Sequence, residues 1–123
     1  MEQKNNVVVR SWVGHPRFDT QRERGWLNHL WKLHRSWYNF LVPQMKLMSK
    51  QRNGSKVRRR CGTPSPPYRR VLRSKALDDA GQANLKQLYE ALNPARLRRE
   101  MLDITDQLWR YAASKERQYQ YDR

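Results

Sequence analysis

The sequence has no acidic residue between Glu23 and Asp78. The interval 24–77 carries fourteen Lys or Arg, whereas the rest of the chain holds twelve basic residues against eleven acidic ones. Almost all of the formal net charge of +15 therefore lies in one central block. Such a block favours a polyanionic partner, because displaced counterions drive the association. A solvated basic linker without a specific ligand is the alternative interpretation.

Other residue types that define common functional sites are also scarce. Cys61 is the single cysteine, so no internal disulfide can form. His29 and His34 are five residues apart, which is not a metal-ligand spacing, and we expect neither metal nor cofactor. No apolar run is long enough to cross a membrane, and the N-terminus lacks signal-peptide features. The lack of a membrane span and of a signal peptide predicts a cytoplasmic protein without a membrane partner. No Gly-rich phosphate loop or Ser/His/Asp spacing occurs, so enzyme motifs are absent.

The apolar content predicts a small core. Hydrophobic residues make up 37% of the chain and charged residues 30%, and five Trp and six Tyr supply much of the apolar bulk. This share is below that of a typical compact globule. We therefore expect part of the chain to become ordered only on a partner.

The first strong helix prediction covers 20–41. Asp19 or Thr20 can cap it, with Glu23 completing a capping box. One apolar stripe follows at helical spacing, formed by Leu27, Leu30, Trp31, His34, Tyr38 and Leu41. Trp26, Trp37 and Phe40 widen the stripe, either for core packing or as a surface for another subunit. Pro43 should stop this helix, while residues 2–13 fit a strand or a helix equally well.

The most basic part of the central block, residues 43–75, shows no hydrophobic periodicity. It is called the basic block below. We expect a turn at Asn53-Gly54-Ser55 and an extended, polyproline-like path over 62–67. The prediction for 48–67 in the free protein is a lack of regular structure. A short helix is expected to start within 68–73.

Beyond the basic block, the pattern predicts two further helices. Asp78 or Asp79 can cap the first, which places Leu85, Leu88, Tyr89 and Leu92 on one face. Asn93-Pro94 marks the start of the second. Its buried face should contain Leu97, Met101, Ile104, Leu108 and either Tyr111 or Ala112. We expect the pair to form a helical hairpin over 79–112, followed by a polar tail that frays.

Several segments, in this order, resemble bacterial insertion-sequence transposases with a retroviral-integrase-like catalytic core. They are Glu2-Gln3-Lys4-Asn5 with Val8-Val9-Arg10 and Val13-Gly14, Tyr38-Asn39-Phe40-Leu41-Val42-Pro43, Met45-Lys46-Leu47 with Ser49-Lys50, Gly54-Ser55-Lys56-Val57, Thr63-Pro64 with Pro67-Tyr68-Arg69-Arg70-Val71-Leu72, and Leu92-Asn93-Pro94-Ala95-Arg96-Leu97 with Arg99-Glu100. The resemblance implies that Glu2 occupies the position of the third carboxylate of an Asp-Asp-Glu triad. It also favours a helix for 2–13.

The sequence departs from that family in ways that bear on chemistry. The two Asp and the sheet that would carry them have no counterpart here, and Gln44 stands where many relatives carry His. Two-metal phosphoryl transfer needs several carboxylates that converge on ions about 4 Å apart. One carboxylate cannot form that site, so we expect no catalysis by this chain and no complete RNase H-like sheet.

Together these observations predict a mainly α protein in which amphipathic helices flank an extended basic segment. The segments are 1–43, a remnant of the C-terminal helices of an integrase-like core; 44–77, which binds nucleic acid; and 78–123, the helical hairpin and tail. The predicted function is non-catalytic DNA binding, related to transposition or integration, in a nucleoid-associated protein. The predicted contacts are Lys46, Lys50, Arg52, Lys56, Arg58, Arg59, Arg60, Tyr68, Arg69, Arg70, Arg73 and Lys75. In this set Arg69, Arg70 and Arg73, with Tyr68 among them, are expected either to enter a groove or to stack on bases.

Three alternatives fit the same residues. An RNA-associated protein of a large ribonucleoprotein would have the same charge and aromatic content. A regulator could pair with an intact transposase, or with a second copy of itself, through its helices. A decayed reading frame would have no selected role.

Overall fold

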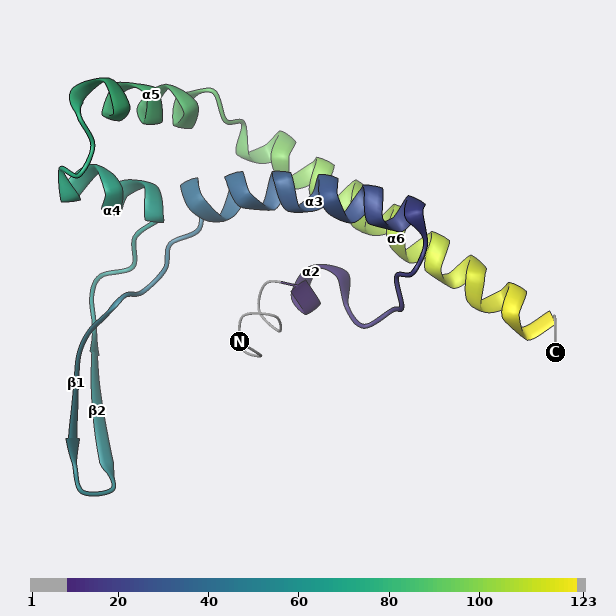
Figure 1. The fold of residues 1–123 in the computed structure, drawn as a ribbon, viewed down its shortest axis with the longest axis horizontal. Helices are drawn as coiled ribbons and strands as arrows, with labels where there is room; N and C mark the ends of the chain where they lie inside the picture. Colours follow the sequence, from purple (N-terminus) through teal and green to yellow (C-terminus); the bar gives the residue numbers. More distant parts are fainter. Residues whose placement is uncertain (1–8, 122–123) are drawn as a thin grey trace. The chain divides into compact units, whose positions relative to one another are not determined.

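The computed structural model describes the backbone of residues 9–121 and the side chains of residues 9–118. The described elements are α2 (Ser11–Val13), α3 (Gln21–Phe40), β1 (Leu47–Asn53), β2 (Lys56–Cys61), α4 (Pro67–Ser74), α5 (Asp79–Glu90) and α6 (Pro94–Tyr121). The protein is mainly α, with one two-stranded sheet that does not close, which confirms the predicted mainly α class without a complete RNase H-like sheet (Figure 1). The helical hairpin predicted over 79–112 is not confirmed, because residues 79–90 and 95–112 belong to different compact units. Two compact units are present, residues 1–34 with 95–123 and residues 35–94.

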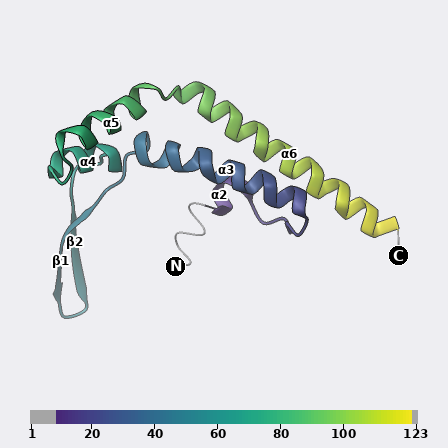
Figure 2. The ribbon, with the colours of Figure 1, turned by 45° about the horizontal axis from the view of Figure 1, so that its top comes forward.

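The first unit contains the buried hydrophobic core. α6 contributes Leu97, Met101, Ile104, Leu108 and Ala112, which are all less than 9% exposed. Within this unit α3 and α6 run side by side in opposite directions (Figures 1 and 2). Leu30 and His34 of α3 are buried, as is Val13 of α2. The buried face predicted for the last helix is thereby confirmed, because its 3.6-residue period matches the packing surface.

The start of α3 is fixed by the predicted capping box. Thr20 Oγ1 accepts a hydrogen bond from the Glu23 backbone N–H at 3.3 Å, and Glu23 Oε2 accepts one from the Thr20 N–H at 2.9 Å. These reciprocal bonds satisfy two donors that a helix N-terminus otherwise leaves unpaired. Asp78 is the N-cap of α5, and its side-chain Oδ1 accepts a hydrogen bond from the Gly81 backbone N–H at 2.9 Å. α3 ends at Phe40 and α6 begins at Pro94, as the sequence predicts.

The second unit is organised by an antiparallel hairpin, and here a prediction was wrong. Residues 48–67 are not irregular, because β1 and β2 pair from Leu47 with Cys61 to Asn53 with Lys56. Gly54 and Ser55 form a two-residue turn in which only Gly54 has a positive φ, 61°. Glycine at the first central position is typical of a type II′ turn, whose twist matches that of paired strands.

The hairpin is continued beyond the named strands at its base. Gly62 N–H donates to the Lys46 carbonyl at 2.9 Å, and Gln44 and Ser65 exchange backbone hydrogen bonds at 3.2 and 3.1 Å. The extended path expected before α4 is present, with Pro66 at φ −60°, ψ 148°. α4 then runs from Pro67 to Ser74, and its C-cap residue Lys75 has a left-handed φ of 52°. The short helix expected within 68–73 is confirmed.

Two smaller expectations about the helices were wrong. Leu88 was expected on an apolar face but is 52% exposed, and α5 has no fully buried residue. The C-terminal tail was expected to fray, but α6 continues to Tyr121. Lys115, at the start of this tail, is held by the carboxylates of Asp19 and Glu23. Residues 2–8, and with them the position of Glu2, lie outside the described residues.

An aromatic stack packs the second unit in place of an aliphatic core. The rings of Tyr68 (α4) and Tyr89 (α5) are parallel within 11° and 4.7 Å apart. Phe40 lies 5.4 Å from Tyr68 and 6.5 Å from Tyr89. Such offset and tilted arrangements are favourable for aromatic rings. The stack therefore holds the end of α3, α4 and α5 together.

Candidate nucleic-acid interface

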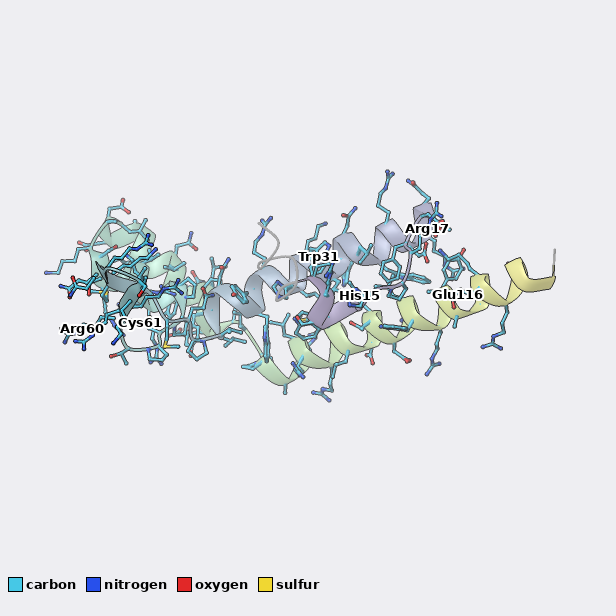
Figure 3. The ribbon with its side chains drawn as sticks, turned by 90° about the horizontal axis from the view of Figure 1, so that it is seen from below. His15, Arg17, Trp31, Arg60, Cys61 and Glu116 are labelled. Atoms are coloured by element: carbon cyan, nitrogen blue, oxygen red, sulfur yellow. The ribbon has the colours of Figure 1, made fainter. Side chains whose placement is uncertain are left out.

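The hairpin is exposed along its whole length. Every residue of β1 and β2 is exposed, so neither face of the ribbon packs on the protein. Six of the predicted contact residues lie on it, namely Lys50, Arg52, Lys56, Arg58, Arg59 and Arg60. Figure 3 labels the Arg60 side chain among the side chains at the hairpin. The structure thus presents these cations to solvent on a regular scaffold.

The strand register sorts these cations onto two faces. Successive side chains point to opposite faces of a strand. Arg58 and Arg60 share one face, where they oppose Gln51 and Ser49. Lys50 and Arg59 are directly opposite each other on the other face, which Arg52 also shares. Both faces are therefore cationic, and one of them carries a like-charged cross-strand pair.

The Lys and Arg side chains of residues 46–75 have no acidic partners in the described part of the chain. The ion pairs of residues 9–118 use Arg17, Arg96, Arg110 and Lys115, none of which belongs to 46–75. Arg52 is tied locally, its Nε donating to the Gly54 carbonyl at 3.1 Å. Residues 35–94 hold thirteen basic residues against three acidic ones. The second unit therefore has a strong positive field that its own carboxylates do not neutralise.

α4 places the remaining predicted contacts in different environments. Arg69, Arg73 and Lys75 are exposed, whereas Arg70 is half-buried. Arg70 and Arg73 line a hollow of about 410 Å³ together with Lys46. Arg58, Arg59 and Arg60 line another of about 400 Å³ with Ser49 and Gln51. The predicted residues are thus grouped at two places in one unit, the hairpin and the junction of its base with α4.

Tyr68 is already engaged within the protein. Its ring stacks on Tyr89 and contacts Phe40, so the stacking surface that the sequence suggested for bases is taken by another ring. Tyr68 positions α4, and with it the cations of that helix.

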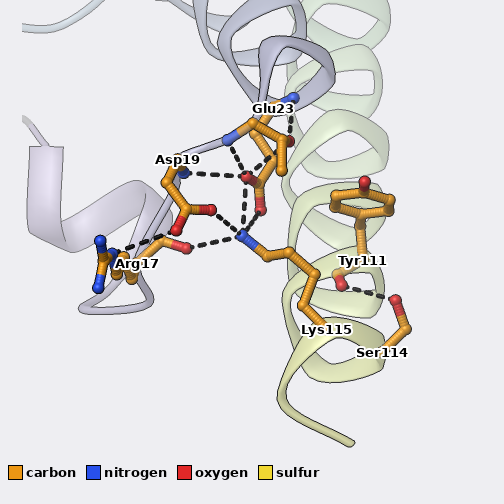
Figure 4. Close-up of polar contacts among 7 residues, drawn as sticks. Arg17, Asp19, Glu23, Tyr111, Ser114 and Lys115 are labelled. Carbon is orange, nitrogen blue, oxygen red and sulfur yellow. Dashed lines mark hydrogen bonds and ion pairs between the residues drawn. The ribbon is translucent and has the colours of Figure 1, made fainter. Parts of the chain in front are cut away.

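One polar cluster, in the first unit, was not recognised from the sequence (Figure 4). The Glu23 carboxylate is fully buried, and Lys115 Nζ lies 2.7 Å from its Oε1. The same ammonium group is 2.8 Å from Asp19 Oδ1, and it donates to the Arg17 carbonyl at 3.1 Å. Lys115 is only 14% exposed at its side chain. The cluster joins the start of α3 to the last turns of α6.

The cluster shifts the pKa values of its members in the directions expected for a buried ion pair. Burial raises the pKa of Glu23, but hydrogen bonds from Lys115 and Thr20 outweigh it and leave this pKa below its ordinary value. The hydrogen bond from Lys115 lowers the pKa of Asp19. Burial lowers the pKa of Lys115, but Asp19 and Glu23 together raise it above its ordinary value. All three groups are therefore charged near neutral pH.

Among the described residues, no group of three or more His, Cys, Asp or Glu side chains is arranged to hold a metal ion. The helices described between residues 9 and 121 include none with the length and apolar character needed to span a membrane.

Comparisons with known proteins add one relative. No protein-family model and no solved structure matches the chain. An uncharacterized protein of Sinorhizobium fredii, y4rM, is 36% identical to it over 70 residues. The aligned part is 57% of this chain and 20% of that protein, so the chain spans about a fifth of the relative's length. The name of this relative states no activity.

Proposed function

We propose that this chain binds duplex DNA through the β1–β2 hairpin and α4, as a non-catalytic component related to transposase or integrase proteins. The observation that carries the proposal is the hairpin itself. All of its residues are exposed, it is cationic on both faces, and no carboxylate within residues 9–118 pairs with its Lys and Arg side chains.

The energetics of the hairpin favour a polyanionic ligand. A single two-stranded hairpin without a buried face is marginally stable in water. Like charges directly opposite across strands, such as Lys50 and Arg59, weaken it further. A phosphate backbone removes this repulsion and releases its own counterions. Ligand binding is thus coupled to the stability of the strand pairing.

The dimensions of the hairpin suit duplex DNA. Seven residues of β1 span roughly 23 Å at about 3.3 Å per residue. A two-stranded ribbon of this kind fits the major groove, which is about 12 Å wide. The side chains of both faces would then reach the phosphates on either side, and the exposed Arg69 on α4 is available to read a base edge.

The salt dependence of binding tests this proposal. If about five to eight phosphates are neutralised, log affinity should fall against log salt with a slope of roughly −4.5 to −7. Replacing Arg58, Arg59 and Arg60 by Ala should reduce the magnitude of the slope by about 2.7. The matched control replaces Arg24, Lys32 and Arg117, three exposed cations of the first unit. The control has the same net charge and should keep most of the slope. Equal loss in both triple variants would mean that the hairpin is not the interface.

Competition distinguishes DNA from RNA as the ligand. The charge argument applies equally to both, so the slope alone does not identify the partner. We expect duplex DNA to remain bound against a matched excess of structured RNA at physiological salt. Ready displacement by RNA would replace the DNA-binding proposal with a role in a ribonucleoprotein.

A further inference from the structure

The hollow between the hairpin base and α4 differs from the rest of the basic surface. Its volume is about 410 Å³, and its polar lining is formed by Lys46, Thr63, Ser65, Arg70, Arg73 and Ser74. The lining thus contains three cations and three hydroxyl groups, and no carboxylate. Such a set recognises a tetrahedral oxyanion, because every charged group is a donor.

The backbone fixes the walls of this hollow. Lys46 is held by the hydrogen bond from Gly62 N–H, and Ser65 by its bridge with Gln44. Ser65 is only 3% exposed. Arg70 and Arg73 are three residues apart on α4, so they lie on one side of the helix. The donors therefore come from two elements, the base of the hairpin and α4.

Arg70 provides the observation that points to a ligand. Its Nε is buried and has no hydrogen-bond partner among the described residues. Arg73 Nη2 makes only a long contact, 3.4 Å, to Ser65 Oγ. Arg70 as a whole is half-buried, so the unpaired group is its Nε–H, and a buried donor without an acceptor is costly. An oxyanion in the hollow can be bound by the guanidinium groups of Arg70 and Arg73, because both residues line it.

We propose that this hollow binds one phosphate group of the nucleic acid, with Arg70 and Arg73 as the planar donors and Lys46 as a point charge. This inference rests on the proposed function and adds a defined anchor to it. The hairpin cations act as dispersed charges, whereas this site holds one phosphate in a fixed orientation and so sets the register of the protein on its ligand. The phosphate is either an internal phosphodiester or a terminal phosphomonoester.

The first experiment uses the unmodified full chain and inorganic phosphate as the probe. The Nε–Hε resonances of the arginines are followed by nuclear magnetic resonance as phosphate or chloride is added at equal ionic strength. We expect the Arg70 signal to shift saturably with phosphate alone, while the Arg58 signal follows ionic strength in both series. An Arg70 signal that responds like that of Arg58 would overturn the proposal.

The second experiment measures duplex binding by the Arg70→Lys variant, which keeps the charge but loses the planar fork. We expect a roughly tenfold weaker affinity, the scale set by one charge-assisted hydrogen bond. Arg24→Lys, at an exposed cation of the first unit, is the control, and its affinity should change less than twofold because that residue lies outside the proposed interface. A loss on both 5′-phosphorylated and 5′-hydroxyl duplexes supports an internal phosphodiester, whereas a loss confined to the phosphorylated duplex supports a terminal phosphate. Equal behaviour of the two variants on both duplexes contradicts the site.

The two proposals fail in different ways. If duplex DNA does not bind but inorganic phosphate saturates the Arg70 signal, the phosphate site stands and the DNA-binding function fails. If duplex DNA binds with a hairpin-dependent salt slope while Arg70 responds to neither experiment, only the phosphate site is refuted.

Discussion

At the scale of single residues, Glu23 has two roles at the start of α3. Its carboxylate completes the capping box with Thr20 and also neutralises Lys115, which is 92 residues away. A fully buried carboxylate is tolerated only where its oxygens are paired and hydrogen-bonded. Here Oε2 accepts hydrogen bonds from Thr20 and Lys115, and Oε1 lies 2.7 Å from Lys115 Nζ as an ion pair, so the pair links the ends of the first unit's two long helices.

Lys115→Met should therefore destabilise the helical unit by about 2 kcal/mol near neutral pH. This is less than the loss for an isolated buried charge, because Thr20 continues to hydrogen-bond Glu23. Arg110→Ala removes the exposed ion pair with Asp106 on the same helix and should cost less than about 1 kcal/mol. Urea unfolding followed by circular dichroism measures both. Equal effects of the two variants would mean that the Lys115 cluster contributes no more than a surface pair.

The pH dependence of that difference follows from the pKa directions. Glu23 and Asp19 have pKa values below their ordinary 4.5 and 3.8, so their contribution is complete above about 4.5 and is lost as pH falls through the lowered values. Lys115 has a pKa above its ordinary 10.5, so its contribution is complete below that pH and is lost as pH rises further. The Lys115→Met deficit should thus be constant between about pH 5 and 9 and shrink in acid. A deficit unchanged at pH 3 would contradict this assignment.

At the scale of elements, the hairpin depends on its turn. Gly54 has a φ of 61°, and a Cβ there would meet no atom within 4 Å. A side chain at this position is therefore limited by backbone strain alone, at about 1 kcal/mol. Gly25, within α3, also has open space but no positive φ.

The two glycines should respond oppositely to alanine. Gly54→Ala should weaken the strand pairing and DNA affinity without lowering the stability of the helices. Gly25→Ala should raise helix stability by up to about 1 kcal/mol, because alanine favours a helix more than glycine does. Thermal unfolding and a DNA titration of each variant measure these effects. A lower unfolding temperature for Gly54→Ala with unchanged affinity would mean that the hairpin supports the helices rather than the ligand.

The elements also show which features a sequence can predict. The buried face of α6 was predicted residue by residue, from Leu97 to Ala112, because a helix that packs on one side leaves a 3.6-residue period. The hairpin was missed because both of its faces are exposed, so neither strand alternates between apolar and polar residues. Its available signal was local: Gly54-Ser55, a two-residue Gly-Ser loop, is typical of a hairpin turn.

The candidate site was predicted only in part. Composition was sufficient to find the basic residues, but their grouping needs the strand register and the position of α4. The half-burial of Arg70 and its proximity to Lys46 depend on the ladder between Gln44 and Ser65. The pairing of Glu23 with Lys115 could not be read from the sequence either, since no local pattern connects residues so far apart.

At the scale of the whole molecule, the two units differ in what stabilises them. The first has the buried hydrophobic residues and the buried ion pair. In the second, the described residues include no buried hydrophobic side chain, and Ser65 alone is buried. Stability is expected to be lowest where buried apolar contacts are fewest. The hairpin should therefore open far more often than α6 in the absence of a ligand.

Backbone amide hydrogen exchange, with and without duplex DNA, tests the central claim most directly. Without DNA, we expect weak protection of β1 and β2 and strong protection of α6 around Met101 and Leu108. With saturating DNA, protection should rise across 47–61 and 66–75, and the change should be small in α6. DNA that binds but leaves the exchange of the hairpin unchanged, or that protects the exposed side of α6 instead, would contradict the assignment of this hairpin as the nucleic-acid interface.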